Sequence, residues 1–98
     1  MNLRALARGR ECQVRIPGVC NRDPATTVLA HYRLAGLCGT GMKPPDEISA
    51  WACFCCHQLV DGRSYSAEYT RDQIKLMHAE GVLRTIVELV SSGVLRHG

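Results

Sequence analysis

The sequence contains no long apolar run. No segment approaches the roughly 18 consecutive apolar residues of a membrane-spanning helix, and the N-terminal stretch MNLRALARGRECQ has three arginines but no apolar signal-peptide core. The chain also lacks internal repeats and low-complexity tracts. We therefore expect a cytoplasmic protein that does not bind membranes and that folds as a single domain over residues 1–98.

The chain is also short of the apolar surface that a stable domain needs. With 98 residues it buries only a small core, and domains of this size usually depend on a metal, disulfides or a partner. Six cysteines suggest which of these applies. Because disulfides do not persist in a reducing cytosol, we interpret paired cysteines as metal ligands or catalytic thiols, with disulfides as the alternative.

Positive charge is concentrated towards the N-terminus. The formal net charge is +3, but residues 1–36 contain six arginines against Glu11 and Asp23, a balance of +4 that leaves −1 for residues 37–98. A basic cluster attracts polyanions such as nucleic acid, although a solvated basic segment has the same composition. The candidates for contact with nucleic acid are Arg8, Arg10, Arg15, Arg33 and Lys43.

Turn residues and hydrophobic periodicity predict an α+β fold. Gly62 ends the first of two predicted C-terminal helices, and Thr70 with Gln73 forms a predicted capping box for the second. In chain order the expected elements are a short helix in 3–10, a turn-rich loop over 12–24, a strand within 26–34, a long Gly- and Pro-rich loop to residue 47, a strand over 48–52, a helix from 53 to 61 and a long amphipathic helix over 71–92, interrupted at most by Gly81.

Four cysteines form two pairs, Cys12 with Cys20 and Cys53 with Cys56. Zinc prefers four tetrahedral nitrogen or sulfur ligands, usually delivered as two short-range pairs. The pairs therefore predict a structural zinc that ties the first loop to the start of the helix, with a ββα unit between them, which is a treble clef. Two alternatives remain: the cysteines are free and buried, or Cys38 replaces Cys12 or Cys20 as a ligand.

Three further residues suggest chemistry that a closed four-cysteine zinc site does not perform. His57 and Asp61 are four positions apart, so they share a helix face and can hold a second, open-coordinated divalent ion. His31, near the end of a strand, is an imidazole that can activate water. The alternatives are that His57 is a zinc ligand beside Cys56 and that Asp61 only solvates the helix end. Cys55 should be a small buried hydrophobe.

The segments CQVRIPGVC, VLAHYRL and ACFCCHQLVD resemble the HNH, or ββα-metal (His-Me finger), endonucleases, and in detail the small nucleases of bacteriophages and prophages. The resemblance covers at least residues 8–63, and a helical extension over about 66–93 lies outside the general motif. It implies that His31 is the general base and that His57 and Asp61 coordinate a catalytic Mg²⁺ or Mn²⁺, or in some members Zn²⁺. It also implies that the paired cysteines bind the structural zinc.

Two positions depart from the family pattern. The residue before the base is often an Asp or His that also binds the ion, and here it is Ala30. The middle asparagine, which orients the base in the family, has no clear equivalent, and Asp46 is the candidate for its function.

The sequence therefore predicts a metal-dependent endonuclease that hydrolyses phosphodiester bonds in nucleic acid, with DNA as the expected substrate, a histidine base and a single divalent ion. The first alternative is a non-catalytic, zinc-stabilised treble clef that binds nucleic acid. The second is a protein-interaction module that docks through residues 71–92. Because that helix has more apolar residues than a small ββα unit can cover, we also expect a homodimer through it.

Overall fold

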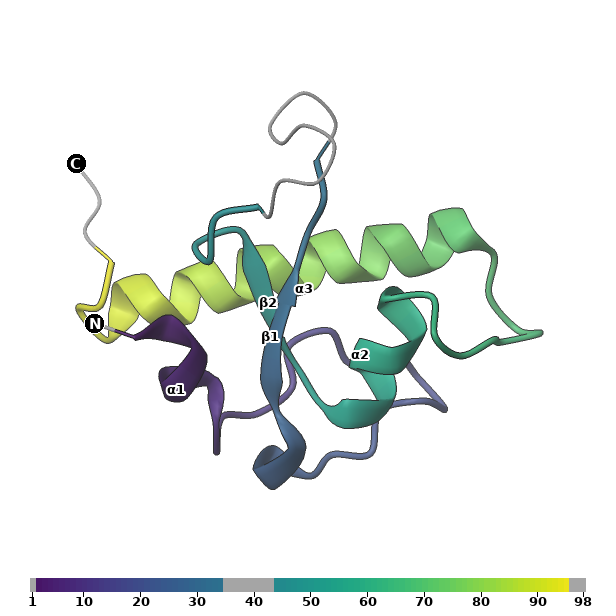
Figure 1. Cartoon of the computed structure of the whole chain (residues 1–98), viewed down its shortest axis with the longest axis horizontal. Helices are drawn as coiled ribbons and strands as arrows, with labels where there is room; N and C mark the ends of the chain where they lie inside the picture. The colour runs from purple at the N-terminus through teal and green to yellow at the C-terminus, as the bar shows by residue number, and fades with distance from the viewer. Residues whose placement is uncertain (1, 35–43, 96–98) are drawn as a thin grey trace.

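The protein is built on a two-stranded antiparallel sheet with helices on both sides of it (Figure 1). The computed structural model describes residues 2–34 and 44–95. In chain order, its elements are α1 (Leu3–Ala7), the 3₁₀ turn η1 (Pro24–Thr26), β1 (Val28–His31), β2 (Ser49–Ala52), α2 (Phe54–Val60) and α3 (Arg71–Ser91). The predicted α+β class is confirmed.

Several elements are shorter than the sequence patterns predict. The first helix ends at Ala7 because Gly9 adopts a left-handed backbone with φ 84°. The first strand begins at Val28, since Thr26 belongs to η1, where its hydroxyl donates to the Asp23 carbonyl at 2.8 Å. Local side-chain bonding of this kind competes with strand formation. Within the described ranges, none of the helices combines the length and the apolar content that a bilayer span requires.

The second strand lies at the centre of the molecule and is buried along its whole length. On one side β2 pairs with β1 in the register His31↔Ser49 to Val28↔Ala52. Beyond the ladder, the Trp51 carbonyl accepts from the Gln13 amide at 2.7 Å, and the Trp51 amide donates to Thr85 Oγ1 at 2.9 Å. The N-terminal loop and α3 therefore both attach directly to β2.

The long helix α3 crosses behind the sheet (Figure 1) and is continuous through Gly81. It begins at the predicted capping box, in which Thr70 and Gln73 exchange both hydrogen bonds. A Cβ at Gly81 would lie 2.9 Å from Val14 Cγ2 and 3.0 Å from Val14 Cα. The glycine therefore allows α3 to pack closely on the loop that contains the first cysteine pair.

Candidate metal and catalytic site

Cys12, Cys20, Cys53 and Cys56 converge on one point. Their sulfur atoms all lie within 4.8 Å of one another, and Cys53 Sγ is 3.8 Å from Cys20 Sγ. Four sulfurs at the usual Zn–S distance of about 2.3 Å in a tetrahedron lie about 3.8 Å apart. The predicted pairs are therefore arranged as a set of four that can hold a metal ion.

Local backbone geometry prepares these sulfurs for a cation. Cys53 is the N-cap of α2, and its sulfur accepts amide hydrogen bonds from Asn21 and Cys56, each at 3.4 Å. The Arg15 amide donates to Cys12 Sγ at 3.5 Å, and Arg15 has a positive φ of 54°. Amide donors favour the thiolate form that zinc binds.

Hydrogen bonding and burial shift the pKa values of these thiols in different directions. A hydrogen bond with the Cys56 thiol lowers the pKa of Cys12 to about 4. The same bond raises the pKa of Cys56, with burial adding to it, and burial raises the pKa of Cys20 to about 11. Ionisation is thus favoured at Cys12 and opposed at Cys20 and Cys56, and a bound cation would favour the thiolate form at those two. Zinc fits this donor set.

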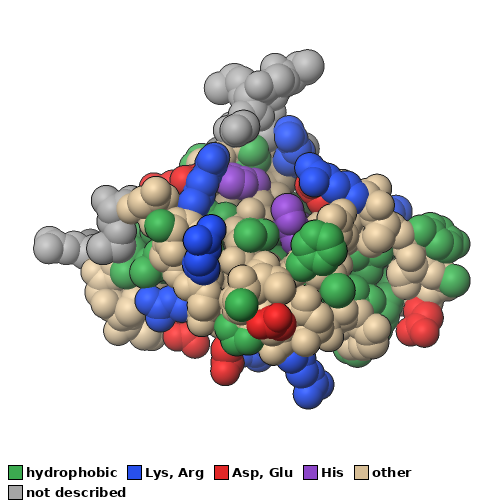
Figure 2. Space-filling view, turned by 60° about the horizontal axis from the view of Figure 1, so that its bottom comes forward, with side chains coloured by type: hydrophobic (Ala, Val, Ile, Leu, Met, Phe, Trp, Pro, Cys, Tyr) green, Lys and Arg blue, Asp and Glu red, His purple; other side chains and the backbone are tan. Residues whose placement is uncertain are grey.

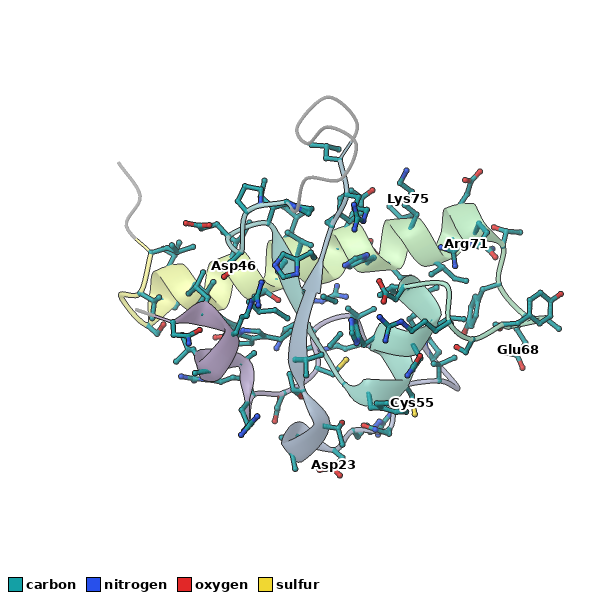
Figure 3. All side chains as sticks on the ribbon, in the orientation of Figure 1. Asp23, Asp46, Cys55, Glu68, Arg71 and Lys75 are labelled. Carbon is teal, nitrogen blue, oxygen red and sulfur yellow. The ribbon has the colours of Figure 1, made fainter. Side chains whose placement is uncertain are left out.

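The other two cysteines are Cys55 and Cys38. Cys55 lies on α2 outside the cluster and is half-buried, so it is less enclosed than the sequence suggested (Figure 3). Cys38 and the candidate Lys43 lie outside the described residues.

His31 and Asp46 form a close polar contact at the end of β1. His31 ends β1, and its Nε2 is 2.7 Å from Asp46 Oδ1. A turn places the carboxylate there, since the Ile48 amide donates to the Pro45 carbonyl at 3.0 Å and the Tyr32 amide donates to the Ile48 carbonyl at 3.0 Å. A carboxylate accepts, so Nε2 is the protonated nitrogen in this arrangement and Nδ1 retains a lone pair when the ring is neutral.

His57 and Asp61 lie one turn apart on α2. Asp61 is the C-cap of the helix, and its Oδ2 pairs with Arg63 Nε at 3.0 Å. Burial lowers the pKa of His57, against the opposing charge of Asp61, so the imidazole is neutral at pH 7. Within residues 2–34 and 44–95, the cysteines are the one group of three or more such ligand atoms close enough for a metal. His57 and Asp61 therefore offer at most two donors of an open site.

A cavity of about 470 Å³ lies between the end of β1, the end of α2 and the first half of α3. His31 and Asp61 both line it, as does His78 from α3. Its basic lining residues are Arg33, Arg71 and Lys75. Figure 2 shows histidine side chains at the surface with lysine and arginine side chains around them, and Figure 3 shows Arg71 and Lys75 projecting from the first half of α3.

The cavity includes residues that the sequence interpretation missed. Residues 71, 75 and 78 lie at i, i+4 and i+7, so the helical spacing alone puts them on one face of α3. Two cations and a histidine on one face were the available signal. The sequence could not indicate that this face turns towards β1 and α2.

The arginines predicted to contact nucleic acid are spread over different parts of the molecule. Arg33 lines the histidine cavity, whereas Arg15 lines a second cavity of about 450 Å³ beside Cys12. Arg10 lies over the Trp51 ring, with its guanidinium carbon 5.4 Å from the ring centroid, and Arg8 is exposed at the end of α1. Of these four, Arg33 is the one that the geometry brings to His31.

Comparison with known proteins gives the family. The sequence model of the family described as "Putative nuclease YbcO" matches residues 1–94. Proteins with that name from Escherichia coli (strain K12) and from Enterobacteria phage 82 are each 53% identical over 97 residues, which is 97% of both chains. A solved structure, "a putative bacteriophage protein from Escherichia coli str. K-12 substr. MG1655", is 46% identical, has a TM-score of 0.78 and matches 94% of this chain and 100% of that one. The chain therefore belongs to the YbcO family of putative nucleases.

Proposed function

We propose that the protein is a metal-dependent endonuclease of the HNH, or ββα-metal, type, which hydrolyses phosphodiester bonds and takes DNA as its substrate. The observation on which this depends most is the His31–Asp46 pair at 2.7 Å, in which His31 lines a cavity that has three cations, Arg33, Arg71 and Lys75, and two carboxylates, Asp61 and Asp72, in its wall. An oriented imidazole beside basic groups is the arrangement that hydrolysis of an anionic diester requires.

The fold in this proposal is a treble clef closed by zinc. Cys12, Cys20, Cys53 and Cys56 would hold the ion, and all four positions of a tetrahedral site would be occupied by protein. Such a site stabilises the fold and leaves chemistry to other residues. It also holds the start of α2 against the first loop, so that His57 and Asp61 project from a helix with a fixed N-terminus.

His31 acts as the general base. In the proposed step, a water oxygen attacks phosphorus and the water proton passes to Nδ1 of His31. The bond from phosphorus to the leaving oxygen breaks, and that oxygen takes a proton from solvent water. Asp46 holds the ring through Nε2–H and stabilises the imidazolium that forms, which is the orienting function that the family assigns to an asparagine. A divalent ion held by His57 and Asp61, Mg²⁺ or Mn²⁺, would supply charge stabilisation at the phosphoryl and leaving oxygens.

In this proposal, three cations would bind the backbone of the substrate. Arg33, Arg71 and Lys75 line the cavity next to His31, and the guanidinium of Arg71 is held by a 3.1 Å bond from Nη1 to the Leu59 carbonyl. Contacts of this kind position nucleic acid without reading its sequence. Binding should therefore weaken steeply as salt increases.

Two observations favour a second function, a treble clef that binds nucleic acid without cleaving it. Asp61 already pairs with Arg63 at 3.0 Å, and Ala30 stands where the family often has another ion ligand. In that case the zinc clasp and the basic surface would be retained, and the histidine site would hold no catalytic ion.

Nicking of supercoiled plasmid separates the two functions. The purified protein is incubated with plasmid, single-stranded and branched DNA and with RNA, in EDTA or with added Mg²⁺ or Mn²⁺. The endonuclease proposal predicts cleavage that requires the added ion and is lost in a His57→Ala variant that keeps its zinc. Salt-sensitive binding to the same DNA, with no cleavage under any ion, would support the second function instead.

A further inference from the structure

His78 is a buried imidazole on α3 that contacts both chain neighbours of His31. The residue is 7% exposed, and its Nε2 lies 2.9 Å from the carbonyl oxygen of Ala30, 48 positions earlier in the chain. The ring also meets the Tyr32 ring edge-on, with centroids 5.1 Å apart. Since Ala30 and Tyr32 flank His31, α3 touches the strand on either side of the proposed base.

The hydrogen bond fixes the protonation of the ring. A carbonyl oxygen can only accept, so Nε2 of His78 carries the hydrogen. Burial lowers the pKa of His78 against the effect of this bond, and the ring is therefore neutral at pH 7. Within the part of the chain that is described, His78 does not join a set of three metal-ligand atoms. Its geometry supports holding the strand, not coordinating an ion.

The end of β1 needs such a support. The strand is four residues long and pairs with β2 on one side. Beyond its last residue, the Tyr32 amide bonds to the Ile48 carbonyl at 3.0 Å, which ties the chain to the β2 side. The His78 bond ties the residue before His31 to α3. With both bonds, the backbone at His31 is held from two directions, close to Asp46.

We propose that His78 is a positioning residue, which donates its Nε2 hydrogen to the Ala30 carbonyl and so holds His31 against Asp46 in the reactive geometry. This inference rests on the proposed endonuclease function. A displacement of about 1 Å at a reacting group lowers rates by about 100-fold. A buried histidine that only completes the packing of α3 would affect stability but not the placement of His31.

Two variants separate these roles. His78→Gln keeps an amide N–H donor at a similar reach, whereas His78→Leu keeps an apolar body of similar size without a donor. The measurements are kcat and KM for metal-dependent nicking, the melting temperature and the zinc content. We expect His78→Leu to lower kcat by about 100-fold with KM within a few-fold of the wild type, and His78→Gln to restore kcat to within about 5-fold.

A second readout does not require activity. The ¹⁵N chemical shifts of the His31 ring report its tautomer, which should be the Nε2–H form in the wild type and in His78→Gln and a mixture in His78→Leu. If the wild type cleaves no nucleic acid, the proposed function fails and this comparison still decides the positioning role. A folded His78→Leu protein with wild-type kcat or wild-type His31 shifts would overturn the inference.

The test also holds if His78→Leu does not fold. A folded His78→Gln protein with kcat reduced 100-fold would then overturn the role of the donor. So would a wild-type protein in which the ¹⁵N shifts of His78 show that Nε2 carries no hydrogen at pH 7. Retained activity in His78→Gln, with the Nε2–H form of His78 in the wild type, would support it.

Discussion

Removal of one sulfur from the cysteine cluster should unfold the protein. Cys53 joins the cluster to α2, because its sulfur accepts two amide bonds at 3.4 Å, lies 3.8 Å from Cys20 Sγ and caps the helix. A serine oxygen can still accept from the amides, but a hydroxyl does not deprotonate to become a zinc ligand at neutral pH. The Cys53→Ser substitution therefore removes the metal bond and leaves much of the capping.

The size of this effect follows from what zinc contributes to folding. Binding at structural zinc sites contributes about 10–16 kcal/mol at pH 7 in small domains. A domain of this length is stable by about 5–15 kcal/mol in total. Loss of the ion thus removes a free energy comparable with the whole stability, and we expect no cooperative unfolding transition in the variant.

Cys55→Ser is the matched control. Cys55 is two positions away on the same helix, half-buried and outside the cluster, so its change should cost about 1 kcal/mol, or several degrees in melting temperature. The assay is zinc content by atomic absorption together with thermal unfolding by circular dichroism. The wild type and Cys55→Ser should contain about one zinc per chain. A Cys53→Ser protein with full zinc and an unchanged melting curve would refute the account of the cluster.

Three more outcomes can be measured on the same material. Gly81→Ala should lower the free energy of unfolding by about 1–3 kcal/mol in chemical denaturation, because its Cβ would lie 2.9–3.1 Å from Val14 atoms; stabilisation would show that α3 can move away. Burial depresses the pKa of His78 below its unfolded value of 6.5, so the free energy of unfolding should fall as pH drops below about 6.5, by at most about 1.4 kcal/mol per pH unit. The fall should be smaller in His78→Gln, and equal pH slopes in the two proteins would contradict this. Light scattering should show a dimer at tens of micromolar, since α3 exposes the apolar side chains of Leu76, Leu83 and Val87. Substitution of these residues by lysine should convert the dimer to a monomer, and a monomeric wild type would contradict the expectation.

Features with strong local signals were predictable from sequence. The capping box of Thr70 and Gln73 determines where α3 begins. Cys53 follows the last residue of β2 and is the N-cap of α2. The cysteine spacing predicted the four sulfurs that the structure brings together. Asp46 was identified as a candidate to orient the base, and the structure places it 2.7 Å from His31, while its role stays a prediction.

Features that depend on long-range packing were not predictable. His78 meets Ala30 across 48 positions, and no local pattern tells a helical histidine at a site from one at any other buried position. Arg71 and Lys75 line the cavity with His31 because of how α3 packs, and their spacing along the helix does not indicate that packing. The first strand was predicted too long because Thr26 favours strands by composition, while its hydroxyl bonds within the preceding turn.

The most direct test of the central claim is the single-turnover cleavage rate of His31→Ala. General-base assistance is typically worth about 10²- to 10⁴-fold in rate. With saturating enzyme and Mg²⁺ or Mn²⁺, the variant should cleave plasmid DNA slower than the wild type by that factor. The variant should remain folded with its zinc content and DNA affinity unchanged, since His31 is neither one of the four clustered cysteines nor one of the cations that line the cavity. A His31→Ala protein that nicks plasmid at the wild-type rate would contradict the proposed mechanism.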